Sequence, residues 1–347
     1  MKQYVVEKPG IRKSVEEELK RKKVCAPVKQ ENSANFSAIH SFEEIVWGPP
    51  QTVIPPKKYF LPTSENILSF RKRDGGFEVE ALNAAEEIVL FGVHPCDLNA
   101  IYLTDRIFAE KNQDENYLAK REKAVLIGVD CLTPCSPEAV CLRMDGLNPG
   151  DRFDLFLTDI GDVYFVEAAS RKGEEFLRGE GRPASEIDHR KLSSVRKQRD
   201  ELFDQEEKKL LPDYNDLPGL MKRNYVHAVW EEHGEKCYGC GSCNMVCPTC
   251  YCFDVEDYMR VDLENGFRKR FWDGCMLEDF AKVASGENFR EERFDRLRHR
   301  TNRKLNYLFD KWGQSFCTGC GRCIKACLTH IVSPLEIANE IFQRQSV

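Results

Sequence analysis

Two runs of closely spaced cysteines near the C-terminus are the residues whose types and spacing point most directly to chemistry. Each run has the pattern C-x2-C-x2-C-x3-C, and the eight thiols are Cys237, Cys240, Cys243, Cys247, Cys317, Cys320, Cys323 and Cys327. Thiolates are the soft ligands that iron–sulfur clusters require. Zinc sites are the alternative, but their ligands normally come as two pairs separated by a longer spacer. The repeated spacing therefore predicts two [4Fe–4S] clusters.

The order of the thiols also predicts which cysteines share a cluster. The spacing is that of bacterial two-cluster ferredoxins, in which the fourth cysteine of each run binds the other cluster. On that pattern the first cluster is held by Cys237, Cys240, Cys243 and Cys327, and the second by Cys317, Cys320, Cys323 and Cys247. Glycines between these cysteines let the backbone fold closely around a cluster, and they are Gly239, Gly241, Gly319 and Gly321.

The length and composition are those of an ordinary globular chain with room for two domains. The chain has 347 residues, of which 41% are hydrophobic and 31% charged. Its first residues lack the apolar core of a signal peptide, and no stretch has the length of a membrane span. Sixteen cysteines without an export signal predict a cytoplasmic protein that uses thiols as ligands. A net charge of −6 argues against a general nucleic-acid binder.

The N-terminal part contains a βαβ unit that would position four further thiols. Apolar runs at 87–93 and 124–129 predict buried parallel strands, and 98–110 predicts the connecting helix with Asp97 as its N-cap. The carboxyl ends of parallel strands meet at one edge of a sheet, where such folds bind ligands. The thiols that follow these strands are Cys96, Cys131, Cys135 and Cys141. They are candidate ligands of a third [4Fe–4S] cluster, although buried cysteines near a turn explain the spacing as well.

The remaining patterns complete the predicted architecture. A hairpin is expected over 153–168, a charged helix over 185–211, and helices over 277–285 and 291–309 between the two cysteine runs. Arginines concentrate at 288–304, either as a solvated helix face, or to compensate the negative charge of the clusters or dock an acidic partner. We therefore predict an α+β protein: an N-terminal α/β domain with a partly parallel sheet over residues 1–225, then a mainly helical two-cluster ferredoxin domain over 226–347.

Several segments, taken together and in order, resemble one family. They are Gly92–Leu98, Gly128–Met144, Cys247–Asp254, Phe271–Cys275, Val283–Asn288 and Cys317–Cys327. The chain resembles the 4Fe–4S dicluster subunits typified by the iron–sulfur subunit of anaerobic sulfite reductase and the β subunit of cytoplasmic [NiFe] sulfhydrogenases. The resemblance implies an electron-transfer subunit without a substrate site of its own. It would link an FAD subunit that reacts with NAD(P)H to a catalytic subunit, with a sirohaem sulfite reductase preferred and a [NiFe] hydrogenase next.

The chain departs from the family pattern at two places near cysteines. The usual Cys-x-Cys before Ser-Met appears as Ala139-Val140-Cys141 before Arg143-Met144, so one thiol is missing and Cys135 is the candidate replacement. Leu328 stands where the family has a proline. Three further cysteines match the family but have no spacing that suggests ligation, and they are Cys250, Cys252 and Cys275. We interpret them as buried residues beside the clusters.

Two rival functions follow from other residues. An iron–sulfur reductase would have its own site near His94, Cys96 and Cys131, because a cysteine beside a histidine can act as a nucleophile. A structural iron–sulfur protein of nucleic-acid metabolism would place the arginines of 290–303 on a phosphate backbone. Neither the glycine fingerprint of dinucleotide-binding folds nor the P-loop motif of nucleotide-binding proteins occurs in this sequence. An electron-transfer role remains the preferred prediction.

Overall fold

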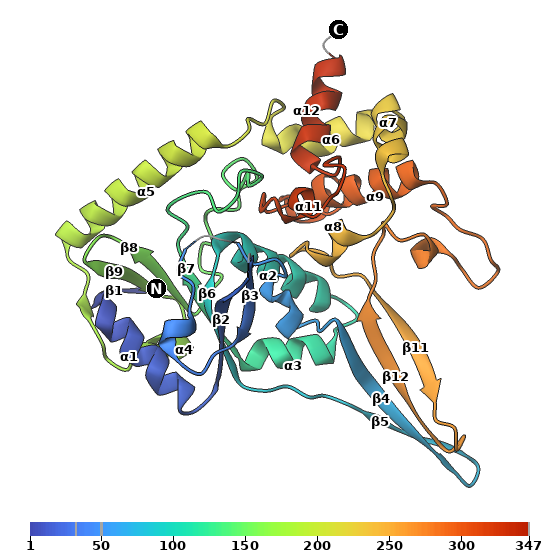
Figure 1. Cartoon of the computed structure of the whole chain (residues 1–347), viewed down its shortest axis with the longest axis horizontal. Helices are drawn as coiled ribbons and strands as arrows, with labels where there is room; N and C mark the ends of the chain where they lie inside the picture. The colour runs from blue at the N-terminus through green and yellow to red at the C-terminus, as the bar shows by residue number, and fades with distance from the viewer. Residues whose placement is uncertain (32, 49–50, 346–347) are drawn as a thin grey trace.

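The computed structural model describes residues 1–31, 33–48 and 51–345, and its centre is an eight-stranded mixed sheet (Figure 1). The strand order is β10-β1-β9-β8-β7-β6-β2-β3. The strands are β1 (Lys2–Glu7), β2 (Lys23–Gln30), β3 (Ser33–Ala38), β6 (Ile88–Val93), β7 (Ala124–Val129), β8 (Leu155–Asp159), β9 (Val163–Ala168) and β10 (Arg182–Pro183). The four strands β2, β6, β7 and β8 are parallel, and the outer strands pair antiparallel. The predicted partly parallel sheet is confirmed.

Both faces of the central strands are covered by helices, which explains why their sequences are apolar throughout. One face packs Val89 and Phe91 against α1 (Lys8–Leu19) and α4 (Arg171–Leu177). The other packs Leu90 and its neighbours against α2 (Pro95–Phe108) and α3 (Glu115–Lys123). Burial on both sides removes the polar alternation that a half-exposed strand would show.

The predicted βαβ unit, hairpin and charged helix are present, with one correction. The strands at 88–93 and 124–129 and the hairpin of β8 and β9 match the expectation, and α5 (Glu186–Glu206) is the charged helix. The prediction that Asp97 caps α2 is wrong, because the helix starts at Pro95 and its N-cap is His94. Proline is favoured in the first turn because its backbone is already helical and it has no N–H to satisfy. Asp97 consequently lies inside the first turn.

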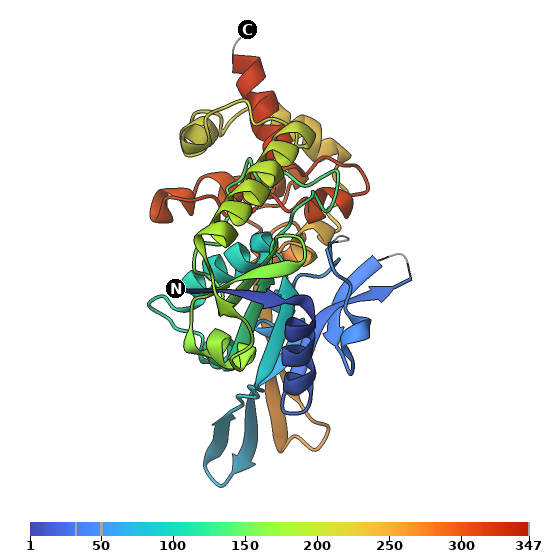
Figure 2. The ribbon, with the colours of Figure 1, turned by 90° about the vertical axis from the view of Figure 1, so that its left-hand side faces the viewer.

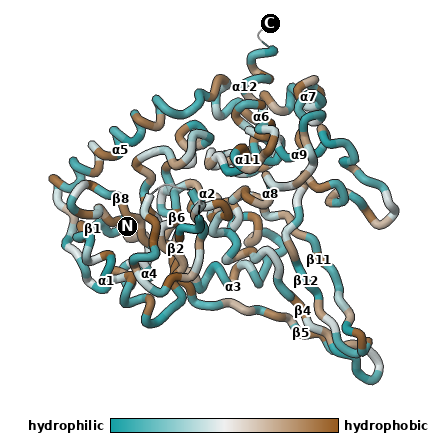
Figure 3. The backbone as a smooth tube through the Cα atoms, viewed as in Figure 1, coloured by the Kyte–Doolittle hydropathy of each residue, from teal (hydrophilic) through white to brown (hydrophobic). Residues whose placement is uncertain are grey.

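A second sheet of four antiparallel strands forms an arm that projects from the body (Figures 1 and 2). Its order is β11-β12-β4-β5, and the strands are β4 (Ser64–Arg73), β5 (Gly76–Ala81), β11 (Phe253–Met259) and β12 (Asn265–Trp272). The tube in Figure 3 is largely hydrophilic along the arm. Strands from either side of residue 225 share this sheet through the pairing of β4 with β12. This sheet therefore joins the two sides of the predicted domain boundary.

Short helices build the C-terminal part around the cysteine runs. They are α6 (Leu217–Arg223), α7 (Ala228–Lys236), α8 (Ser242–Met245), α9 (Arg293–Leu305), α10 (Phe309–Trp312), α11 (Arg322–Lys325) and α12 (Pro334–Gln345). Single 3₁₀ turns are η1 (Phe42–Glu44), η2 (Pro56–Tyr59), η3 (Tyr214–Asp216) and η4 (Asp279–Ala281). Among the described residues, no helix is long and apolar enough to cross a membrane.

One of the two helices predicted between the cysteine runs is wrong. The pattern at 291–309 corresponds to α9, but 277–285 contains only the turn η4. Instead of continuing a helix, the chain turns there: the N–H of Val283 donates to the Glu287 carbonyl at 2.9 Å, and the N–H of Gly286 donates to the Val283 carbonyl at 2.8 Å. The hairpin of β11 and β12 was not predicted.

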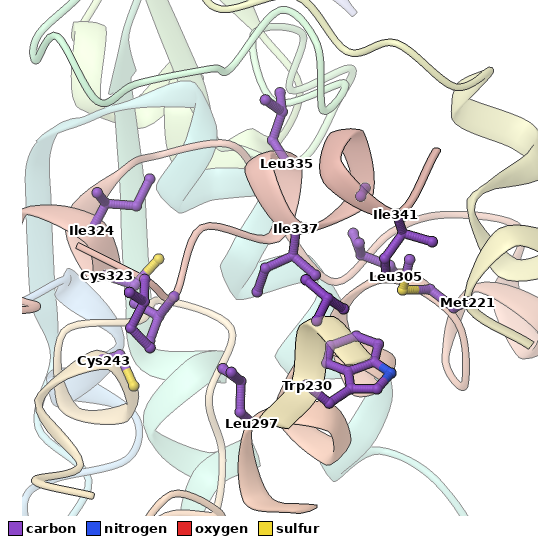
Figure 4. Packing of buried hydrophobic residues seen from close by; sticks show 14 of the residues in the cluster. Met221, Trp230, Cys243, Leu297, Leu305, Cys323, Ile324, Leu335, Ile337 and Ile341 are labelled. Atoms are coloured by element: carbon purple, nitrogen blue, oxygen red, sulfur yellow. The ribbon is translucent and has the colours of Figure 1, made fainter. Parts of the chain in front are cut away.

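The apolar core of the C-terminal part ends at the cysteine runs. Trp230, Leu297 and Ile337 are among its fully buried members, and Figure 4 shows them packed between the helices. Cys243 and Cys323, one from each run, belong to the same core and lie at one side of it in Figure 4. The helices therefore fix the two cysteine loops relative to one another.

Candidate iron–sulfur centres

Two cavities lie between the cysteine runs, and each is bordered by four thiols. The thiols of the first are Cys237, Cys240, Cys243 and Cys327. The thiols of the second are Cys247, Cys317, Cys320 and Cys323. Each cavity thus combines three cysteines of one run with the fourth cysteine of the other. This is the grouping that the ferredoxin pattern predicts.

The local backbone explains how each run surrounds a cavity. Gly241 and Gly321 precede α8 and α11 with φ values of +70° and +73°, so a tight loop turns directly into a short helix. The loop presents three thiols, and the helix carries the fourth away toward the other cavity. Gly319 has a φ of +68°, and a Cβ atom there would come within 2.3 Å of the carbonyl oxygen of Val140. Only glycine satisfies both the backbone conformation and this close approach.

Hydrogen-bond donors surround the thiol that crosses to the first cavity. Burial works to raise the pKa of Cys327, but donors from the Thr329 hydroxyl and from the backbone N–H groups of Ile331, Thr329 and His330 hold it below its usual value. In the first run, the N–H of Gly239 lies 3.4 Å from the Cys237 sulfur. Such donors stabilise a thiolate, which is the form that binds iron.

Two buried cations from α9 line the second cavity without a carboxylate partner. Arg300 and Lys304 are only 1% and 5% exposed. Lys304 Nζ donates to the Thr249 hydroxyl at 2.6 Å, and Arg300 donates to the Val332 carbonyl at 3.1 Å. Among the described residues, no carboxylate lies within ion-pair distance of either side chain. A buried unpaired cation is costly, so an anionic cluster bound by thiolates fits this charge.

The burial of these arginines decides between the two interpretations of the basic segment. Arg296 and Arg300 are 4% and 1% exposed, so they do not belong to a solvated helix face. That interpretation is wrong for them, because their side chains fold inward toward the cysteine loops. Buried side chains also cannot reach a nucleic-acid backbone, which removes much of the basis for that rival function.

The spacing of the thiols differs from that of a mononuclear metal site. Among the residues that the structure describes, no three His, Cys, Asp or Glu side chains are grouped closely enough to hold one metal ion. Thiolate ligands of zinc lie about 2.3 Å from a common ion and hence close to one another. The thiols here instead border two cavities, with four thiols around each.

The four thiols proposed for a third cluster also converge. Cys96 lies in the first turn of α2 and Cys131 follows β7, so both occupy the carboxyl edge of the sheet. A hydrogen bond with Cys96 is the main cause that raises the pKa of Cys141, and burial adds to it. Burial together with Cys96 raises the pKa of Cys135 to about 12. These thiols share an apolar cluster with Cys320, which belongs to the second cavity.

A buried ion pair joins this group to the second cysteine loop. The guanidinium of Arg322 donates to both carboxylate oxygens of Asp97 at 2.7 Å, and both side chains are 2% exposed. Arg322 also donates to the Thr52 carbonyl at 2.7 Å, and the N–H of Val140 donates to the Gly319 carbonyl at 2.7 Å. Sequence reasoning missed this contact, although both residues lie next to predicted ligands and have opposite charges.

Comparison with known proteins gives the family. A family described as a 4Fe–4S dicluster domain matches residues 236–331. The chain is also 32% identical over 316 residues to sulfhydrogenase 2 subunit beta of Pyrococcus furiosus, and the match covers 89% of each chain. The chain belongs to this 4Fe–4S dicluster subunit family. No solved structure matches it significantly.

Membership of the dicluster family confirms the resemblance and the cofactors. The chain is an iron–sulfur electron-transfer subunit that carries two [4Fe–4S] clusters, and the zinc alternative is set aside. The dicluster domain begins one residue before Cys237 and ends four residues after Cys327, so it contains both cavities. The buried thiols, the inward N–H donors and the unpaired cations all fit an anionic cofactor.

Proposed function

We propose that this chain relays single electrons between an FAD subunit that reacts with NAD(P)H and a catalytic subunit of a cytoplasmic redox complex. The ligands are the four thiols of each cavity: Cys237, Cys240, Cys243 and Cys327 in the first, and Cys317, Cys320, Cys323 and Cys247 in the second. The observation that carries this proposal is the pairing of two thiol-lined cavities in a chain from a family of complex subunits. Each bound cluster supplies a one-electron redox centre.

The name of the relative bears on the catalytic partner. It is the β subunit of a sulfhydrogenase, so we infer that a hydrogenase-type catalytic subunit is the partner of this chain. The sequence alone favoured a sirohaem sulfite reductase, and that preference stays a prediction. Co-purification of the native complex, followed by assays for hydrogen and for sulfite, separates these two partners.

One thiol of the first cavity is accessible to a partner subunit. Cys240 is exposed, and its neighbours Tyr238 and Leu328 are 71% and 80% exposed. The first cavity is therefore the proposed point of electron exchange with one partner subunit.

The four thiols at the carboxyl edge of the eight-stranded sheet support an extension of the electron path beyond the two cavities. We propose that Cys96, Cys131, Cys135 and Cys141 hold a third [4Fe–4S] cluster, which would stand on the far side of the second cavity. Cys141 Sγ contacts the Gly319 carbonyl at 3.5 Å, so this group adjoins the second cysteine loop. Cys131 and Cys135 are only partly buried, which provides an approach from a second partner. The Arg322–Asp97 pair would hold the two sites at a fixed separation.

Iron and acid-labile sulfide per chain, measured on protein purified without oxygen, test this assignment. About twelve of each indicate three cubes and about eight indicate two, because each cube contains four irons and four sulfides. Zinc in place of iron would refute the whole proposal. Cys320→Ser is expected to damage the second cluster and slow electron flow between the partner subunits. Cys25→Ser is the matched control, because Cys25 is completely buried in β2 outside both cavities.

The activity of the isolated chain distinguishes a reductase from an electron relay. A reductase with its own site near Cys96 and Cys131 would reduce substrate with a low-potential dye as the only electron donor. A relay is inactive under those conditions and becomes active when both partner subunits are added. Reduction of substrate by the isolated chain would therefore contradict the relay.

A further inference from the structure

Two side chains at the second cavity carry buried hydrogen-bond donors that have no partner among the described residues. Arg300 is 1% exposed and Thr318 is 4% exposed, and both line this cavity. Arg300 Nη1 donates to the Val332 carbonyl at 3.1 Å, but Arg300 Nε is buried without a partner, and so is the Thr318 hydroxyl. Unsatisfied buried donors are rare in native proteins, so these two need an acceptor at the cavity.

Sulfur is the acceptor that the second cavity offers. Four thiols border it, and in the dicluster family such thiols hold a [4Fe–4S] cluster, whose sulfurs accept hydrogen bonds. Thr318 directly follows the thiol of Cys317, and Arg300 lies one helical turn before Lys304 on α9. The donors therefore come from two different elements, the second cysteine loop and α9.

The first cavity lacks this combination of donors. Among the described residues, no lysine or arginine lines it. A hydroxyl lies close to one ligand sulfur in each cavity, at 3.3 Å from Ser242 in the first and at 3.4 Å from Thr249 in the second. Arg296 Nη2 approaches the first loop, 3.5 Å from where a Cβ of Gly239 would lie, but Arg296 does not line the cavity. Cations and the Thr318 hydroxyl therefore distinguish the second cavity from the first.

We propose that Arg300 and Thr318 donate hydrogen bonds to sulfurs of the second-cavity cluster and give that cluster the higher reduction potential of the two. This inference rests on the proposed ligand grouping. Reduction adds a negative charge to a cluster, so cations and hydrogen-bond donors beside it favour the reduced form. Burial acts in the opposite direction, but the charges of Arg300 and Lys304 are buried as well and hence weakly screened. An electron shared between the two clusters would then reside mainly on the second.

Redox titration of the native complex, followed by electron paramagnetic resonance, tests this inference with two variants. Thr318→Val replaces a hydroxyl with a methyl group of similar size, and Arg300→Met removes a donor together with its charge. Both should lower the midpoint potential of the same component, the one with the higher potential. The loss of one hydrogen bond should change the equilibrium constant for reduction by up to about tenfold, or about 59 mV for one electron.

Thr301→Val is the matched control for the loss of a hydroxyl. Thr301 is completely buried, and its hydroxyl also has no partner among the described residues, but it lines neither cavity. Its midpoint potentials should equal those of the wild type. Cys320→Ser identifies the component that belongs to the second cavity, because it removes one of the thiols there.

The inference is overturned if Thr318→Val and Arg300→Met bind both clusters and leave every midpoint potential unchanged. It is also overturned if the component that they shift has the lower potential or persists in Cys320→Ser. The relay itself would survive these results. If Cys320→Ser lost no component, the ligand grouping and this inference would both be wrong. If Arg300→Met does not fold, Thr318→Val decides alone, because it changes neither charge nor size.

Discussion

Gly319→Ala tests whether the second cysteine loop is fixed to the N-terminal part by direct backbone contact. Alanine in the left-handed region costs about 1–2 kcal/mol. Its Cβ would also meet the Val140 carbonyl oxygen at 2.3 Å, and relieving such overpacking costs about 1–3 kcal/mol. Moving the two segments apart would weaken the bond from the Val140 N–H to the Gly319 carbonyl, worth about 1 kcal/mol. We therefore expect a destabilisation of about 3–6 kcal/mol.

Gly313→Ala separates the two causes of this loss. Gly313 has nearly the same φ, +71°, but no atom lies within 4 Å of the position that its Cβ would occupy. It should lose only the conformational part, about 1–2 kcal/mol. The assay is the urea midpoint for loss of visible cluster absorbance in protein kept free of oxygen, with the two variants compared under one set of conditions. Equal destabilisation of the two variants would refute the reasoning, because it would mean that the contact with Val140 contributes nothing.

Three further predictions concern buried charges. Asp97→Ala should destabilise the chain by about 3–5 kcal/mol because it leaves Arg322 buried without its anion, and adding Arg322→Met should recover part of that loss in the same urea assay. Lys304→Met should make the second-cavity cluster harder to reduce, and an unchanged midpoint potential in a redox titration would contradict this. Burial lowers the pKa of His299 from 6.5 to about 4. Below pH 6.5 the unfolded chain therefore takes up a proton that the folded chain does not, so the stability present above pH 6.5 is lost as the pH falls toward 4. Between pH 7.5 and 5.5 the wild type should lose more stability than His299→Gln. The difference should reach about 1.4 kcal/mol per pH unit below pH 6.5. Equal losses of the two proteins in thermal unfolding would exclude this effect.

The predictions that succeeded from sequence depend on short-range patterns. Two apolar runs and the helical pattern between them predicted the parallel strands β6 and β7. A strand that is buried on both faces has apolar residues at nearly every position, so its sequence is easy to identify. The cysteine grouping comes in the same way from a spacing that reflects the geometry of one loop and one helix, and the ligand sets stay a prediction. Each apolar run and each cysteine run is shorter than fifteen residues, so tertiary structure had little chance to override its pattern.

Several of the features that were missed depend on contacts between distant segments. The arm pairs β4 with β12, and β11 carries exposed charged residues without the alternation that marks a half-buried strand. The Arg322–Asp97 pair joins two loops whose proximity only the fold determines. Cys250, Cys252 and Cys275 come close together only after the hairpin closes, so their spacing along the chain does not show that they meet. Sequence reasoning grouped thiols that are close in the chain and missed contacts that form only in space.

Cluster insertion should be part of folding rather than a step that follows it. Lys57, Arg300 and Lys304 are each at most 5% exposed and lack a carboxylate partner among the described residues. Without anionic clusters, burying these three cations would cost several kcal/mol each, which is comparable with the whole stability of a typical domain. The C-terminal helices are therefore expected to stay loosely packed until iron and sulfide are present. The eight-stranded sheet has its own apolar cores on both faces, so it does not share this dependence.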